Sequence, residues 1–222
     1  MYAQANELKA ENVRVVSTDE KTGIQALERK YPDKAMKANY VRYREHEYIR
    51  HGTQSLIANF DIATGQCFAP SIADTRTEHD FVEHIEQTIA SDNNPETGWI
   101  FIVDQLNIHK SESLVRFVAK HCKITTDLGI KGKAGILKSM KSRANFLSNA
   151  AHDIRFVYTP KHSSWLNQIE IWFSILVRRL LKTGNFSSTQ DLRKQILDFI
   201  DYFNKTMAKP FKWTYAGRPL QA

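Results

Sequence analysis

Apolar residues gather in five short runs with the length and the β-branched or aromatic composition of β-strands. These runs cover residues 13–19, 55–61, 66–69, 99–104 and 154–158. A Thr-Gly turn at residues 64 and 65 separates the second run from the third, which predicts an antiparallel hairpin. Together with the first run, this hairpin predicts a three-stranded antiparallel meander.

Between the later strands, the apolar residues follow helical spacing. Segment 77–90 places Phe81, Ile85 and Ile89 on one side, and Thr77 precedes them as a plausible N-cap. A helix between two strands implies a parallel neighbour in the sheet. We expect further helices over residues 1–12, 111–121, 165–183 and 192–203, the last capped by Ser187 or Ser188. The whole pattern predicts an α/β domain with one five-stranded mixed sheet flanked by helices.

Three stretches are harder to interpret. Residues 18–23 include Gly23, so we expect a turn that ends the first strand at Asp19. Residues 24–46 are highly charged and predict a long surface loop, in which Arg42 and Arg44 either reach a phosphate or are simply solvated. Residues 123–152 predict a helical insertion, with its helix roughly over residues 136–150.

The charge distribution narrows the class of partner. The formal net charge is +7, but residues 1–109 hold 11 Lys and Arg against 17 Asp and Glu, whereas residues 110–222 hold 20 against 7. A general excess of solubilising charge would explain the basic total, but it would not explain why the basic residues are concentrated in the second half of the chain. A basic half beside acidic residues favours a nucleic acid as the partner.

The length and the cysteine content exclude several other classes of protein. A chain of 222 residues is long enough for one substantial α/β domain, which we expect to span residues 1–222. The two cysteines, Cys67 and Cys122, form no metal-ligand spacing and suit a reducing compartment. No apolar run approaches the length of a membrane span, so we expect a cytoplasmic protein without a membrane partner.

Three acids have positions that indicate a metal site. Asp19 and Asp104 each end an apolar strand, and Glu170 lies near the start of the helix that follows Pro160. An acid at a strand end lies at the rim of the sheet, where open α/β folds bind ligands. Two such aspartates and one glutamate match the hard oxygen ligands that two magnesium ions require. The alternative is that Glu170 faces solvent or forms a salt bridge with Arg178.

The stretches around these acids carry a family resemblance. Residues 19–23 (DEKTG), 103–110 (VDQLNIHK) and 159–170 (TPKHSSWLNQIE) resemble the catalytic domain of DDE transposases, in the bacterial insertion-sequence branch related to the mariner elements. The resemblance implies a ribonuclease-H-like fold with Asp19, Asp104 and Glu170 as the catalytic, metal-binding triad. Glu20 is left out, because it would point away if the strand continued. Gln105 departs from the family, which usually has asparagine there.

The resemblance also implies the chemistry. Two Mg²⁺ ions, for which Mn²⁺ can substitute, would support phosphoryl transfer on double-stranded DNA, with Asp19 bridging both ions. One ion would activate a water and later a DNA 3′-hydroxyl, while the other would stabilise the leaving oxygen. The expected outcome is excision and integration of a transposon by a homodimer assembled on DNA. Relatives carry helix-turn-helix modules before this point, so we expect either a separately encoded catalytic half or a shortened copy that lacks this region and binds transposon ends weakly.

Cations and histidines near these motifs are candidates for DNA contact. The candidate residues are His109, Lys131, Lys133, Lys138, Lys141, Arg143, Lys161 and His162. His109 is as well explained as a residue that fixes its loop, and the lysine-rich helix can also be simply solvated. Trp165 either packs on the sheet edge or stacks on a base.

Two other functions fit the same sequence. A transposase-derived module that binds DNA or assembles complexes without catalysis agrees with Gln105 and with the missing N-terminal region. A stand-alone metal-dependent nuclease on the same fold would use the same three acids. Substituting Asp104 separates these classes, because the change removes cleavage and spares DNA binding only if the chain is an enzyme.

Overall fold

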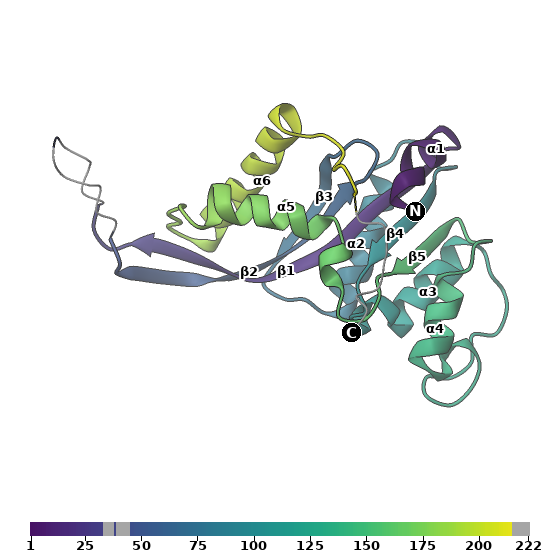
Figure 1. Ribbon diagram of the computed structural model, residues 1–222. Coiled ribbons are helices and arrows are strands. Elements are labelled where there is room, and N and C mark those ends of the chain that lie inside the picture. Colours follow the sequence, from purple (N-terminus) through teal and green to yellow (C-terminus); the bar gives the residue numbers. More distant parts are fainter. Residues whose placement is uncertain (33–37, 39–44, 215–222) are drawn as a thin grey trace, which may run out of the picture.

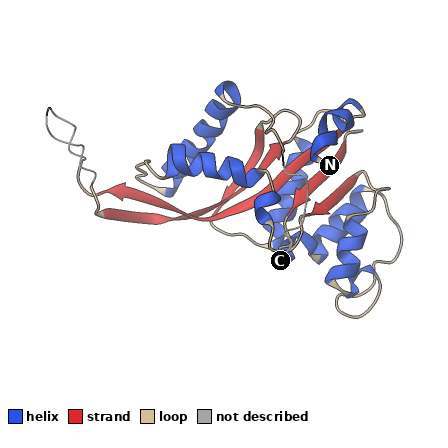
Figure 2. Ribbon diagram, viewed as in Figure 1, coloured by secondary structure: helices blue, strands red, loops and turns tan. Residues whose placement is uncertain are grey.

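The computed structural model describes residues 1–32, 38 and 45–214, and these residues form one five-stranded mixed sheet with helices on both faces (Figures 1 and 2). The strand order is β3-β2-β1-β4-β5. The strands are β1 (Val13–Arg29), β2 (Tyr48–Asp61), β3 (Cys67–Ala73), β4 (Gly98–Val103) and β5 (Ile154–Tyr158). β1, β2 and β3 pair antiparallel, whereas β4 runs parallel to both β1 and β5. The predicted fold class, meander and parallel neighbours are confirmed.

Three helices begin at the hydroxyl caps expected from the sequence. Thr77, Ser111 and Ser188 each accept a hydrogen bond from a backbone N–H in the first turn of the helix that follows. The helices are α1 (Ala5–Ala10), α2 (Glu78–Ala90), α3 (Glu112–His121), α4 (Met140–Leu147), α5 (Ile169–Leu176) and α6 (Thr189–Thr206). Short 3₁₀ turns cover Tyr2–Gln4, Asn107–Lys110, Ile136–Lys138 and Ser164–Leu166, and a π-helical turn, Val177–Leu181, extends α5.

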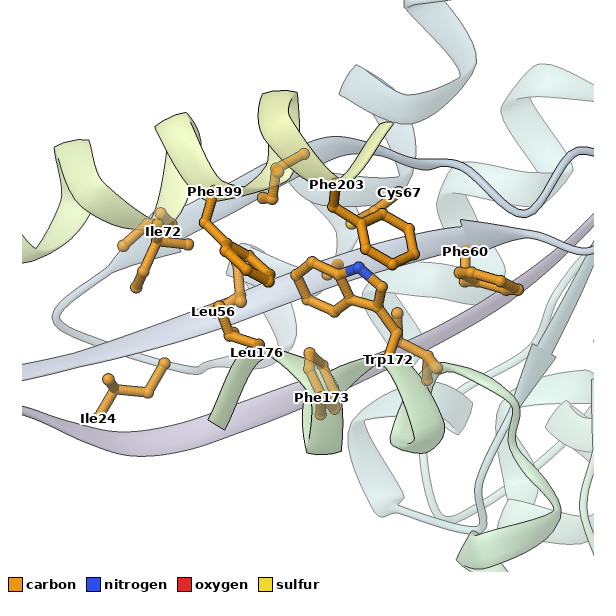
Figure 3. Close-up of a cluster of buried hydrophobic side chains, with 14 of the residues drawn as sticks. Ile24, Leu56, Phe60, Cys67, Ile72, Trp172, Phe173, Leu176, Phe199 and Phe203 are labelled. Carbon is orange, nitrogen blue, oxygen red and sulfur yellow. The ribbon is translucent and has the colours of Figure 1, made fainter. Parts of the chain in front are cut away.

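Alternation along the central strands divides the core into two layers. Val15 packs into a cluster with α5 and α6, whereas its neighbour Val16 packs into a second cluster with α2 and α3. In β4, Ile100 and Phe101 separate in the same way. Figure 3 shows the first cluster, in which aromatic side chains of α5 and α6 meet over β1 and β2. The face of β1 toward which a residue points therefore determines which helices it contacts.

β1 is much longer than predicted. It continues past Asp19 to Arg29, and its pairing with β2 shifts register between Lys21 and Ile24. Gly23 lies there with a positive φ of 68°, so the glycine accommodates a bulge instead of ending the strand. The predicted turn at residues 18–23 and the loop over residues 24–29 are wrong for this reason. Figure 1 shows the outer parts of β1 and β2 extending as a two-stranded ribbon; Arg42 and Arg44 lie outside the described residues.

The segment between α3 and β5 contributes to the core. Its α4 helix spans Met140–Leu147 and is shorter than the predicted helix over residues 136–150. Leu137 and Leu147 are fully buried in the cluster with α2 and α3. In the part of the chain that the structure describes, no helix combines the length and the apolar character needed to cross a membrane.

Candidate metal centre

Asp19 and Asp104 meet where β1 and β4 separate. The parallel pairing of these strands ends at Ser17 and Ile102, and beyond that point β1 pairs with β2. Asp104 directly follows the last residue of β4. Oxygens of Asp19 and Asp104 and a ring nitrogen of His109 all lie within 4.8 Å of one another. The predicted position of the two aspartates at the carboxyl edge of the parallel strands is therefore observed.

Asp19 is a buried carboxylate with few hydrogen-bond donors. Its Oδ1 accepts the Glu20 backbone N–H at 2.8 Å, and its Oδ2 accepts Asn167 Nδ2 at 3.2 Å. Burial, together with the negative charges of Asp104 and Glu20, raises the pKa of Asp19 to about 7. A cation at this point would relieve the repulsion that otherwise favours a proton.

Asp104 is more accessible and is held by its own loop. Its Oδ1 accepts the Leu106 backbone N–H at 2.8 Å and lies 2.9 Å from His109 Nδ1. Burial alone would raise the pKa of Asp104, but the hydrogen bonds from His109 and Leu106 and the positive charges of His109 and Lys110 outweigh it and lower the pKa. The two aspartates therefore differ, because hydrogen bonds and positive charges lower the pKa of Asp104 whereas burial and negative charges raise the pKa of Asp19.

His109 lies between two acids instead of at the surface. Its side chain is 0% exposed, with Nε2 3.1 Å from Glu20 Oε1 and Nδ1 beside Asp104. Burial disfavours its charge, yet the hydrogen bonds to Asp104 and Glu20 raise the pKa of His109 to about 9. The Phe81 ring packs against the imidazole at 4.5 Å. These contacts match the loop-fixing interpretation of His109, and the structure places it away from the surface expected of a DNA contact.

Asn167 attaches the third motif to β1. The Ser17 hydroxyl donates to Asn167 Oδ1 and accepts the Ile169 backbone N–H at 2.9 Å. Asn167 Nδ2 donates to the Thr18 carbonyl at 3.0 Å as well as to Asp19. These bonds join residues about 150 positions apart and fix the start of α5 beside Asp19. The sequence offered one signal for them, the polar Ser17 and Thr18 at the end of an apolar run.

Glu170 follows in the first turn of α5, at the rim of the site. Burial and the charge of Asp104 raise its pKa, and Lys21 opposes them. Within the described residues, its carboxylate is not part of the group within 4.8 Å, and it forms no salt bridge with Arg178. Instead, Glu170 lines an open cleft of about 560 Å³ with Lys21, Phe173 and Arg178.

Gln105 and Lys110 form a second link beside Asp104. Gln105 Nε2 donates to the Thr159 carbonyl at 2.6 Å, and its Oε1 accepts from Lys110 Nζ. The Lys110 ammonium also lies 4.7 Å from the centre of the Tyr158 ring. Gln105 therefore ties the loop after β4 to the end of β5. Lys110 interacts electrostatically with Asp104 and Lys161. It was not among the DNA contacts predicted from the sequence.

The other residues predicted to contact DNA differ in how exposed their side chains are. Six of them are exposed: Lys131, Lys133, Lys138, Lys141, Lys161 and His162. Arg143 is only 8% exposed because α4 packs on the core, and its Nη2 lies 2.7 Å from Met140 Sδ. Trp165 is 55% exposed. The exposed cations keep their interpretation as candidate DNA contacts.

Comparison with known proteins gives one family and a set of similar folds. Residues 14–193 match the family model of the DDE superfamily endonucleases. No curated protein matches the chain. Among solved structures, the Mos1 mariner paired end complex with Mn has a TM-score of 0.54 and 11% identity, covering 90% of this chain and 54% of that chain. A pre-cleavage Mos1 transpososome has a TM-score of 0.53 and 13% identity, with the same coverage.

The similarity to the Mos1 structures is one of fold. At 11% and 13% identity it shows a shared fold, the ribonuclease-H-like catalytic fold expected from the sequence. The chain spans about half the length of the Mos1 chains that it matches.

Proposed function

The chain belongs to the DDE superfamily of endonucleases, and on this basis we propose that it is a transposase catalytic domain of the bacterial insertion-sequence branch. It would cut and join DNA by metal-dependent phosphoryl transfer during transposon excision and integration. The observation that carries this proposal is the pair of aspartates at the edge of the parallel strands, with α5 fixed beside them by Asn167.

The residues present fit a hard divalent cation. Asp19 and Asp104 offer carboxylate oxygens close together, and burial together with repulsion from Asp104 raises the pKa of Asp19. Asp19, Asp104 and Glu170 would hold Mg²⁺ or Mn²⁺. When bound, the ions supply a Lewis acid for the phosphate and lower the pKa of the attacking hydroxyl.

The remaining side chains act on the DNA. Lys110, held beside Asp104 by Gln105, and the exposed Lys161 place positive charge where a scissile phosphate would lie. The exposed lysines of residues 131–141 would follow the phosphate backbone without reading bases. Double-stranded DNA is the proposed partner and a homodimer the proposed assembly on it, in a bacterial cytoplasm.

Cleavage of a supercoiled plasmid tests this function. With Mg²⁺ or Mn²⁺, we expect the wild-type chain to nick the plasmid, and Asp104→Asn to lower the rate about 1,000-fold or more while leaving DNA binding intact. Asp198→Asn is the matched control, because Asp198 is exposed on α6 and pairs with Lys194. DNA binding without nicking by the wild-type chain would instead identify a non-catalytic module.

A further inference from the structure

Glu20 is a buried carboxylate that the three-acid site does not use. Since β1 continues through it, Glu20 points to the opposite face from Asp19, toward the layer of α2 and α3. Its side chain is 1% exposed, and among the described residues its Oε2 has no hydrogen-bond partner. Burying a carboxylate is costly unless it is paired. The polar partner that the described residues give the Glu20 side chain is His109, so loss of His109 should leave this carboxylate unpaired.

The His109 ring has both nitrogens occupied. Nε2 faces Glu20 at 3.1 Å and Nδ1 faces Asp104 at 2.9 Å, and carboxylate oxygens accept hydrogen bonds. Both ring nitrogens therefore face a carboxylate oxygen. The rest of the residue is held as well, because its carbonyl accepts the Tyr158 hydroxyl at 2.8 Å and its ring packs on Phe81.

These contacts act on one oxygen of Asp104. The Leu106 N–H and His109 both approach Oδ1, whereas Oδ2 has no hydrogen-bond partner among the described residues. We propose that Glu20 and His109 form a positioning pair: Glu20 orients the imidazole, and the imidazole orients Asp104 so that Oδ2 is presented to the metal. Carboxylates that bind metals usually need such outer partners. The inference rests on the proposed metal-binding function.

The competing interpretation is that His109 itself binds the metal, since its ring nitrogen lies in the same group as Asp19 and Asp104. Electron spin-echo spectroscopy of Mn²⁺ bound to the chelator-stripped full chain separates the two without any substitution. A positioning role predicts no ¹⁴N coupling from a directly coordinated imidazole. Such a coupling would overturn the role.

Mn²⁺ affinity, measured by titration with electron paramagnetic resonance, tests the contribution of Glu20. We expect Glu20→Gln to weaken Mn²⁺ binding about tenfold, in line with other outer-sphere substitutions. Glu28→Gln is the matched control, because Glu28 lies on the same strand but outside the site. Its Oε2 lies 2.7 Å from His51 Nε2. Thermal unfolding of each variant shows that it is folded.

The outcomes separate this inference from the proposed function. If the wild-type chain binds Mn²⁺ and Glu20→Gln binds it as tightly as Glu28→Gln, the positioning pair is refuted and the metal site remains. If the wild-type chain binds no Mn²⁺ at millimolar concentration, both the metal site and the pair are refuted.

Discussion

β1 carries the glutamates of two glutamate–histidine pairs, one near the middle of the strand and one near its outer end. The inner pair, Glu20 and His109, has side chains that are 1% and 0% exposed, whereas the outer pair, Glu28 and His51, lies on the ribbon with side chains 35% and 28% exposed. The outer pair is the shorter, at 2.7 Å against 3.1 Å. Water competes for the outer pair, while the inner pair has only protein around it. Burial, not distance, therefore decides which pair the molecule depends on.

Removing the inner histidine should give the largest effect. His109→Ala leaves Glu20 buried without a counter-charge, so we expect the free energy of unfolding to fall by about 3–5 kcal/mol. Urea unfolding followed by circular dichroism measures it. A loss below about 1 kcal/mol would mean that water reaches Glu20 and that the two pairs are energetically alike.

The pH dependence of stability should also single out the inner pair. His109 has a folded pKa of about 9, above its ordinary value of 6.5, so its contribution is complete below pH 6.5 and is lost as the pH rises through 9. For the metal-free chain, we expect the free energy of unfolding to fall by about 3 kcal/mol between roughly pH 6.5 and pH 10.

His109→Gln serves as the control for this pH series, because it keeps a hydrogen-bond donor and cannot titrate. Its unfolding free energy should change much less over the same range. Asp19 also titrates, because its pKa is raised from 3.8 to about 7. The loss of stability that Asp19 causes therefore occurs between about pH 3.8 and pH 7, which is below most of the range in which His109 titrates. Equal slopes in the two proteins would contradict a charged His109.

The outer pair should give the smallest effect. His51→Ala removes a partly exposed contact with Glu28, and we expect the free energy of unfolding to change by less than about 0.5 kcal/mol. Plasmid nicking and Mn²⁺ affinity should stay at wild-type values. A large loss of nicking activity or of Mn²⁺ affinity would show that changes in the ribbon affect the metal centre.

The sequence predicted the parts of the site that follow from local patterns. The apolar runs before Asp19 and Asp104 located the edge at which the parallel pairing of β1 and β4 ends, although β1 itself continues past Asp19. Glu170 was likewise expected at the start of a helix. The hydroxyl caps and the two-layer core follow from equally local signals.

The missed features depend on contacts between distant segments. Gly23 resembled the end of a strand, and nothing local shows that β2 continues to pair beyond it. Glu20 was left out of the triad because it would point away from Asp19 if the strand continued, and no local pattern indicates its pairing with His109, 89 positions further along the chain. Arg143 was expected to contact DNA because it lies in a densely basic stretch of the sequence, whereas the packing of α4 buries it.

The hydrogen bond between Asn167 and Asp19 joins residues 148 positions apart, so it can form only late in synthesis. The ribosome releases the strands next to Asp19 and Asp104 well before it releases α5. An incomplete chain thus holds Asp19 and Asp104 without the segment that docks on β1 and carries Glu170. α5 and its Glu170 dock beside Asp19 only when synthesis has passed most of the chain, so premature termination yields products that lack this third acid.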